Sequence, residues 1–297
     1  MMAPNHVESQ LGFLKRNPIY DTVKPYRLRY DPEDGTPRQN IETEMVTVAI
    51  TDARSLRPTI EQQGFALTSV PTAMTYDDFF DHDKIERLYA AELQSHLKTY
   101  FNVPHVRVID YAVRRRHPDF PVSTGKQYEH QQPAALVHLD FSHEEAVRML
   151  KTLYRCNASQ VLKHRWQIIN VWRPLKGPLY DWPLAVCDAR TFTQSRDAQT
   201  ADAVYPEWVY ENVLVHYHPS QQWYYFSGLL DTETMLFKCT DSDTTASGPS
   251  PHAAFPLLRT AGTSGFPRES IESRVFILWA PLEQLPQEVG ALYGKRG

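Results

Sequence analysis

A histidine and an aspartate lie two positions apart in the otherwise apolar stretch PAALVHLDFSHEEA, at residues 133–146. In an extended strand, side chains at positions i and i+2 point to the same face, so His138 and Asp140 project together. A third candidate ligand, His252 in SPHAAF, follows 114 positions after the first histidine. Two imidazoles and one carboxylate on one face of an octahedron leave three positions open, which is the ligand set typical of non-haem Fe(II) oxygenases.

Simpler interpretations of these residues stay open at this point. His138 and Asp140 could form a structural ion pair, with His252 an ordinary loop histidine. His216 and His218 form a second histidine pair with alternate spacing, but no third ligand follows them at a plausible distance along the chain. We predict no catalytic side chain beyond the metal centre itself.

Two arginines downstream of His252 suit the co-substrate that such an iron site commonly uses. The distal carboxylate of 2-oxoglutarate needs a buried cation, and a bidentate arginine fits it best. The segment PRESIESR places Arg268 and Arg274 at 16 and 22 residues after His252. They share strand parity, so both can face the cavity. We favour Arg274 as the residue that binds this carboxylate, because it lies inside the continuous strand SRVFILW. Arg268 is the second candidate.

Residues of the central segments supply weaker candidates. Arg173, in NVWRPL, could anchor 2-oxoglutarate from a middle strand. Trp172, Trp223 and Tyr225 could line an aromatic substrate pocket, although packing in the core is the better interpretation of these three side chains. A surface salt bridge is the alternative role for either of the two downstream arginines.

Sequence periodicity indicates the elements that must position these residues. Apolar residues at helical spacing predict a helix at 76–101, and Ser142 with Glu145 forms a capping-box pattern that starts another helix. Alternating or β-branched stretches predict strands around both histidines of the ligand set. These strands are expected at 45–54, 105–116, 165–175 and 269–282, with three short ones in ENVLVHYHP, QWYYFSG and TMLFKCTDS.

The order of these elements predicts the fold class and domain organisation. Many short strands without βαβ alternation indicate a mostly β protein with flanking helices, and a double-stranded β-helix (a jelly-roll, cupin-like barrel) would bring the ligand strands together. The polar, proline-dotted start predicts an N-terminal arm at 1–44, mobile or draped over the surface. A single domain would then span 45–297, with its jelly-roll core at about 105–282.

Composition excludes several classes of protein. The chain has 297 residues, a net charge of −4 and 22% charged residues, so no global field favours nucleic acid or an anionic membrane. No apolar run of transmembrane length and no signal-peptide core are found. Three cysteines without a close pair indicate neither a disulfide framework nor a zinc knuckle. We therefore expect a reduced, cytoplasmic protein, whose oligomeric state the composition leaves open.

Several longer motifs carry a resemblance to a known family. QPAALVHLDFS, NVWRPLKGPLYDWPLAVCDARTF, QWYYFSGLLDTETMLFKCTDS, PHAAF and RESIESR occur in that order. Together they resemble the fungal hydroxylase/desaturase family, which includes gibberellin desaturase-like and Asa-type enzymes and is related to the bacterial cephalosporin methoxylase component. The resemblance covers about residues 45–282, and the three metal positions match without departure.

This resemblance implies an Fe(II)/2-oxoglutarate-dependent dioxygenase that uses O₂ to hydroxylate, desaturate or otherwise oxidise a small secondary metabolite. It implies a small-molecule substrate as the partner, with no nucleic acid and no membrane. Two other classes stay open. One is a cupin-like metal-binding protein without oxygenase activity, and the other is a zinc hydrolase or isomerase that uses the same ligands.

Overall fold

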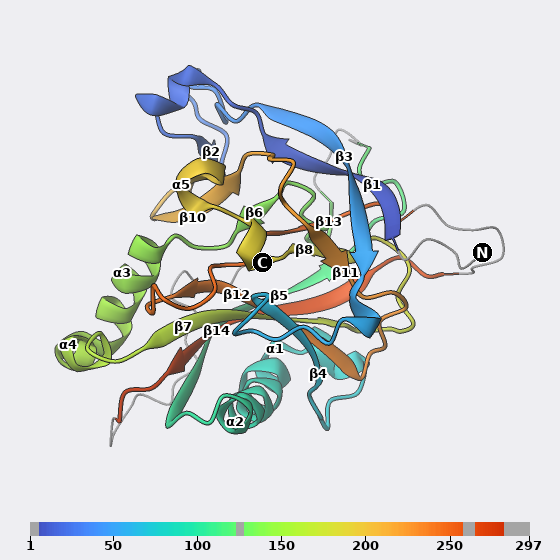
Figure 1. Cartoon of the computed structure of the whole chain (residues 1–297), viewed down its shortest axis with the longest axis vertical. Coiled ribbons are helices and arrows are strands. Elements are labelled where there is room, and N and C mark those ends of the chain that lie inside the picture. Colours follow the sequence, from blue (N-terminus) through green and yellow to red (C-terminus); the bar gives the residue numbers. More distant parts are fainter. Residues whose placement is uncertain (1–5, 123–127, 258–264, 282–297) are drawn as a thin grey trace.

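Two β-sheets packed face to face form most of the computed structural model, which describes residues 6–122, 128–257 and 265–281 (Figure 1). The larger sheet has nine strands in the order β1-β3-β11-β8-β13-β6-β10-β9-β2. Its strands, in chain order, are β1 His6–Leu14, β2 Tyr26–Leu28, β3 Thr43–Asp52, β6 His138–Leu139, β8 Leu184–Cys187, β9 Ala198–Val204, β10 Val209–Val215, β11 Trp223–Tyr225 and β13 His252–Ala254.

The smaller sheet has five strands in the order β4-β12-β7-β14-β5. They are β4 Phe65–Ser69, β5 His105–Arg115, β7 Trp166–Pro174, β12 Glu233–Asp241 and β14 Glu269–Leu278. β14 pairs antiparallel with both β5 and β7, so it occupies the inside of this sheet. The predicted mostly β fold with flanking helices is confirmed.

The core between the sheets is built from the inward side chains of both. Ile168 and Phe276 from the smaller sheet pack in one cluster with Leu139 and Val213 from the larger sheet, and all four are nearly inaccessible to solvent. Strand residues alternate between faces, so neighbours such as Ile169 and Val275 point to the outer side. This alternation decides which polar residues of β7 and β14 can reach the space between the sheets.

Helices cover the outer face and one side of the sandwich (Figure 1). α2 (Ala90–Tyr100) packs Leu93 and Leu97 against the outer face of the smaller sheet. The single helix expected at 76–101 is interrupted, because a 3₁₀ turn, the short α1 and a π-helical turn precede α2. The helices, in chain order, are α1 His82–Lys84, α2, α3 His143–Tyr154, α4 Ala158–Val161 and α5 Gln194–Asp197.

The start of α3 lies immediately after the predicted ligand pair. The Ser142 hydroxyl accepts a hydrogen bond from the Glu145 backbone N–H at 3.0 Å, as the capping pattern predicts. The second half of the box differs from expectation. The Ser142 N–H donates to the Glu211 carbonyl, while the Glu145 carboxylate accepts from Arg148 and from the Glu211 N–H. The helix start is therefore fastened to β10.

The N-terminal segment is part of the sheet, which corrects the expected arm at residues 1–44. β1 pairs with β3 along its whole length, from His6 opposite Thr51 to Leu14 opposite Thr43. Phe13 is fully buried and packs edge-on against Trp223 at 5.8 Å between ring centroids. The expectation of a mobile or surface-draped segment is therefore wrong for residues 6–14, because their alternate side chains complete the core.

The strands predicted around His138 and His252 are present as β6 and β13. The other strand predictions agree with β3, β5, β7, β10, β11, β12 and β14, except that residues 279–281 lie beyond β14 and residue 282 lies outside the described part of the chain. The strands β1, β2, β4, β8 and β9 were not predicted. Within residues 6–122, 128–257 and 265–281, no helix is long and apolar enough to cross a membrane.

Candidate metal centre and adjoining cavity

The structure brings His138, Asp140 and His252 together between the two sheets. β6 pairs with β13 so that His138 lies opposite His252, and the two imidazole centroids are 4.3 Å apart. Asp140 follows directly after β6. Its carboxylate oxygens lie 4.0 Å from His138 Nε2 and 3.8 Å from His252 Nε2. One ligand atom from each residue lies within 4.8 Å of the others.

The hydrogen bond of His138 sets the chemistry of this cluster. Nδ1 lies 2.7 Å from the Leu136 carbonyl oxygen, which can only accept, so Nδ1 carries a proton, and in the neutral imidazole Nε2 carries the lone pair. That lone pair faces the Asp140 carboxylate, which is also an acceptor. A cation between them removes the repulsion, and metal-bound histidines commonly donate their other N–H to a carbonyl in this way. The residues therefore fit a divalent metal ion.

Burial keeps the second histidine in its ligating form. His252 is 6% exposed, and its ring contacts Phe237 at 4.5 Å between centroids. Burial and the neighbouring His138 lower the pKa of His252 to about 3. The imidazole is consequently neutral across the physiological range and has a lone pair to offer a metal.

Two side chains of the smaller sheet orient Asp140. Asn170, on the inner face of β7, donates a hydrogen bond from Nδ2 to Asp140 Oδ2. Arg274, on the inner face of β14, places Nη1 3.8 Å from Asp140 Oδ1. These contacts hold the carboxylate toward the two imidazoles, which is the role that outer-shell partners play around metal ligands.

Arg274 is already neutralised by carboxylates of its own sheet. Its Nε donates to Asp110 Oδ1 at 2.5 Å, and its Nη1 lies 3.3 Å from Glu272 Oε1. Burial would lower the pKa of Arg274, but Asp110 and Asp140 outweigh it and raise that pKa well above its usual value. Burial would raise the pKa of Glu272, but Arg114 and Arg274 lower it to about 2. Carboxylates therefore contact Nε and Nη1 of Arg274, while its buried Nη2 has no hydrogen-bond partner among the described residues.

Arg268 has the same parity but a different environment. It is 1% exposed and lies over the Trp172 ring at 4.9 Å from the centroid. Its Nε donates to Ser270 Oγ at 3.2 Å and its Nη1 to the Trp182 carbonyl at 3.0 Å. Among the described residues, no carboxylate lies within ion-pair distance of this guanidinium, and burial lowers its pKa to about 9. It is a buried cation that lacks a direct counter-ion.

The other candidates from the sequence lie away from the ligand cluster. Arg173 is on the outer face of β7, where its Nη1 donates to the Val70 carbonyl at 3.0 Å. Trp172, Trp223 and Tyr225 are 1%, 1% and 6% exposed, and they pack in the apolar core. None of these four residues lines the cavity beside the metal ligands.

The rival histidine pair makes unrelated contacts. His216 Nδ1 donates to the Leu14 carbonyl at 2.8 Å, and His218 Nδ1 lies 2.8 Å from Ser220 Oγ. Among the described residues, neither joins a group of three side chains that could hold a metal ion.

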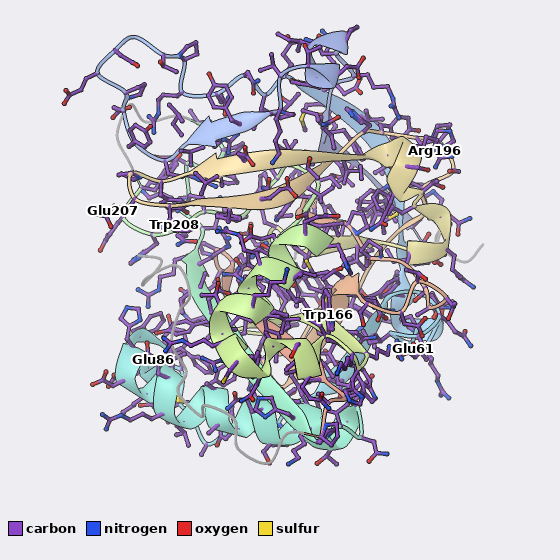
Figure 2. The ribbon with its side chains drawn as sticks, turned by 90° about the vertical axis from the view of Figure 1, so that its left-hand side faces the viewer. Glu61, Glu86, Trp166, Arg196, Glu207 and Trp208 are labelled. Atoms are coloured by element: carbon purple, nitrogen blue, oxygen red, sulfur yellow. The ribbon has the colours of Figure 1, made fainter. Side chains whose placement is uncertain are left out.

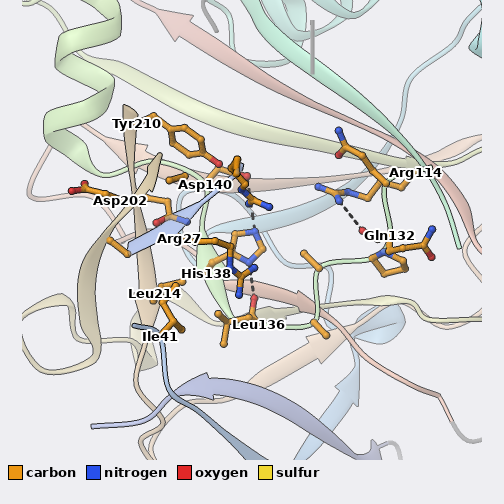
Figure 3. Close-up of a pocket in the computed structure, with 18 of the residues that line it drawn as sticks. Arg27, Ile41, Arg114, Gln132, Leu136, His138, Asp140, Asp202, Tyr210 and Leu214 are labelled. Carbon is orange, nitrogen blue, oxygen red and sulfur yellow. Dashed lines mark hydrogen bonds and ion pairs between the residues drawn. The ribbon is translucent and has the colours of Figure 1, made fainter. Parts of the chain in front are cut away.

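A cavity of about 800 Å³ opens beside His138 and Asp140 (Figure 3). Its walls come from the 131–136 segment, from β9 and β10, and from the N-terminal β2. Arg114 lines it while its Nη1 donates to the Gln132 carbonyl at 2.7 Å. The volume lies in the range of pockets that enclose small molecules.

Sequence reasoning missed Asn170 as the partner of Asp140, and it missed Arg27 and Arg114 in the cavity wall. Asn170 left a signal, because a polar residue on the buried face of a nine-residue strand needs a hydrogen-bonding partner. The sequence around Arg27 gave no such signal, because β2 is only three residues long and joins the sheet at its edge.

Comparisons with known proteins agree with this geometry. The family model described as Oxidoreductase/YMDC permease-like domain matches residues 11–278. The hydroxylase/desaturase CTB9 of Cercospora beticola is 32% identical over 305 residues, which cover 91% of this chain and 90% of the relative. The Fe(II)/2-oxoglutarate-dependent dioxygenase nvfI of Aspergillus novofumigatus is 28% identical over 91% of this chain and 96% of its own length.

A solved structure matches at the level of the whole fold. The iron and alpha-ketoglutarate-dependent endoperoxidase NvfI superimposes with a TM-score of 0.80 at 25% identity, over 94% of this chain and 99% of that one. The expected jelly-roll fold is therefore confirmed. The family model begins at residue 11, so it includes the last four residues of β1, the strand that sequence reasoning left outside the domain.

Proposed function

The chain belongs to this oxidoreductase family, together with the fungal hydroxylase/desaturases, and we propose that it holds Fe(II) with His138, Asp140 and His252. It is an Fe(II)/2-oxoglutarate-dependent oxygenase that oxidises a small secondary metabolite, as the suspected family membership implied. The observation that carries the metal site is the Nδ1–H bond of His138, which leaves an Nε2 lone pair facing the Asp140 carboxylate.

Bound Fe(II) and 2-oxoglutarate supply the activation of O₂ and the oxidation of the substrate. The protein's own residues supply geometry. Asn170 and Arg274 hold the Asp140 carboxylate, and the Leu136 carbonyl fixes the His138 tautomer. His138, Asp140 and His252 would hold Fe(II) as a facial triad, and two of these ligands, His138 and Asp140, line the cavity where a substrate would bind. No further side chain is needed as an acid or base in this proposal.

We propose Arg268 as the anchor of the distal carboxylate of 2-oxoglutarate, in place of the initially favoured Arg274. Arg274 already has Asp110 and Glu272 as partners, whereas Arg268 is buried without a carboxylate partner among the described residues. A dianionic co-substrate would supply the missing charge. The Ser270 hydroxyl, which accepts from Arg268 Nε, could donate its own proton to the same carboxylate.

Arg268 and the metal ligands are joined through the inner face of β7. Trp172 lies beneath Arg268, and Asn170, two residues earlier on the same face, contacts Asp140. Two residues of strand span about 7 Å, which suits a five-carbon diacid held at one end by the metal and at the other by the guanidinium. Arg173 points away on the outer face of β7, so it has no part in this proposal.

Anaerobic addition of Fe(II) and 2-oxoglutarate to the purified protein tests the function. We expect a weak visible charge-transfer band that requires both additions and is lost in Asp140→Ala. His218→Ala is the matched control, because His218 is exposed and contacts Ser220, and it should retain the band. Binding of zinc with no band from iron would instead favour the hydrolase or isomerase class. Iron binding without succinate release from any substrate would favour an inactive metal-binding protein.

We also propose a cytoplasmic location. All three cysteines are free in the described structure, with Cys156 exposed and Cys187 and Cys239 buried, which supports a reducing compartment. Fractionation of the producing cells with an antibody to the protein would test this, and recovery in a secretory or vesicle fraction would contradict it.

A further inference from the structure

The cavity beside the metal ligands has an excess of positive charge at its outer wall. Four arginines line it, namely Arg27, Arg29, Arg38 and Arg114. Two of them are neutralised locally, since Arg114 pairs with Glu272 and Arg38 Nη1 lies 3.0 Å from Asp31. The remaining two, Arg27 and Arg29, form no ion pair with any described residue.

The carboxylates of the same wall are also already paired. Asp140 belongs to the metal ligands, and Asp202 forms an ion pair with Lys24, which in turn contacts Glu211. Asp202 is therefore not available to balance Arg27 and Arg29. The unbalanced charge of the wall is positive and centred on Arg27.

Arg27 is half-buried in the cavity wall and held in place. β2 pairs in parallel with β9, and the Arg27 Nε donates to Gln39 Oε1 at 2.8 Å. Figure 3 shows Arg27 and Arg114 on opposite sides of His138, with Asp202 and Tyr210 on the side of Arg27. Burial, and then the charge of Arg29, lower the pKa of Arg27. A guanidinium in this position gains stability from a bound anion.

An aromatic surface lies next to these arginines. Tyr205 and Tyr210 line the cavity, and Trp208, in the hairpin that joins β9 and β10, stacks with both of them. The two tyrosine rings also contact each other, with centroids 6.2 Å apart. The Tyr205 and Trp208 rings are 4.0 Å apart between centroids at an interplanar angle of 7°, and the Trp208 and Tyr210 rings are 5.5 Å apart at 24°. Figure 2 labels Trp208 beside Glu207 at the edge of the molecule. Tyr205 and Tyr210 thus place aromatic side chains in the same cavity wall as Arg27.

From this juxtaposition we infer that the substrate is a flat, largely apolar ring compound that carries a carboxylate, which Arg27 binds while the ring system lies along Tyr205 and Tyr210. This inference rests on the proposed function, because it gives the substrate class of the same metal site. It also explains why β2, a three-residue edge strand, lies against β9: it supplies the cation that orients the substrate's acid group away from the metal.

A matched pair of probes tests the inference. The protein, loaded anaerobically with Fe(II) and 2-oxoglutarate, is titrated in a calorimeter with 2-naphthoate and with neutral 2-naphthamide. We expect the carboxylate to bind about tenfold to a hundredfold more tightly than the amide. Arg27→Gln should remove this difference, while Arg27→Lys should restore part of it. Arg87→Gln, an exposed arginine outside the cavity wall, is the charge-matched control and should keep it.

The outcomes separate this inference from the proposed function. Equal affinities for acid and amide, no binding of either probe to the wild-type protein, or an unchanged preference in Arg27→Gln would each overturn the substrate class. Displacement of 2-oxoglutarate by naphthoate, seen as loss of the charge-transfer band, would also overturn it, because the acid would then occupy the co-substrate position. Absence of the band before any probe is added contradicts the proposed function alone.

Discussion

The Asn170 side-chain amide donates a hydrogen bond to Asp140, from the middle of one sheet to the carboxylate at the end of a short strand in the other. Asn170 itself sits opposite Arg274 in the register of β7 and β14. Two neighbouring positions of the smaller sheet thus converge on the single carboxylate of the proposed metal site. The larger sheet supplies the ligands, and the smaller sheet aims one of them.

Removing the Asn170 amide should weaken iron binding without unfolding the protein. Asn170→Ala frees the Asp140 carboxylate to rotate, and loss of an outer-shell partner typically costs about tenfold to a hundredfold in metal affinity. Anaerobic Fe(II) titration measures this change. Asn157→Ala, at an exposed position, is the control and should bind iron as the wild type does. Unchanged affinity in Asn170→Ala would show that the metal ligands do not depend on this bond.

Each of the three proposed ligands should be essential for turnover. We expect each single alanine variant, His138→Ala, Asp140→Ala or His252→Ala, to lose bound iron and succinate release. The two protein ligands that remain in each variant would not hold Fe(II). Iron content and succinate are measured on the folded variants. His216→Ala should retain iron, since its imidazole donates to the Leu14 carbonyl. Normal activity in any one of the three ligand variants would contradict the site.

Substitution of Arg268 should weaken binding of 2-oxoglutarate, whereas substitution of Arg274 should lower stability. In Arg268→Ala the distal carboxylate of 2-oxoglutarate loses its charge partner, which costs about 2–5 kcal/mol. The 2-oxoglutarate titration should therefore shift by roughly thirtyfold to several-thousandfold. A shift confined to Arg274→Ala or Arg173→Ala would move the anchor to that residue.

Arg274→Ala should instead lower the free energy of unfolding. It removes the guanidinium that pairs with the buried Asp110 carboxylate, and breaking a buried ion pair from one side costs about 3–5 kcal/mol. Urea unfolding followed by circular dichroism measures the effect. Arg268→Met is the comparison, because it removes a buried cation without stranding a carboxylate and should cost much less. Equal destabilisation by the two changes would argue against a stabilising ion pair between Arg274 and Asp110.

The N-terminal strand should contribute to stability as a core element. Phe13→Ala removes a fully buried ring that packs on Trp223, and such a change typically costs about 3–5 kcal/mol. Met45→Ala, on the partner strand at 56% exposure, should cost far less. Both are compared by chemical denaturation. If Phe13→Ala left stability unchanged, residues 6–14 would act as the loosely attached arm that the sequence suggested.

Local sequence determined the proposed metal ligands because the rule involved is local. Alternation along an extended segment places His138 and Asp140 on one face. The same rule gives a common face to Arg268, which immediately precedes β14, and Arg274, which lies within β14. The helix start at Ser142 is equally local, since its hydroxyl caps an N–H three residues away. These features required no knowledge of distant parts of the chain.

Only the tertiary structure decided which of the two arginines, Arg268 or Arg274, already forms an ion pair within the protein. Asp110 lies 164 positions before Arg274 and meets it through the pairing of β5 with β14, so no local pattern reveals that ion pair. Likewise, the cavity wall takes Arg27 from an N-terminal strand whose three residues join the sheet through β9. Charge compensation depends on which strands become neighbours, and that depends on the burial of the whole core, whereas the direction of a side chain depends on its own backbone.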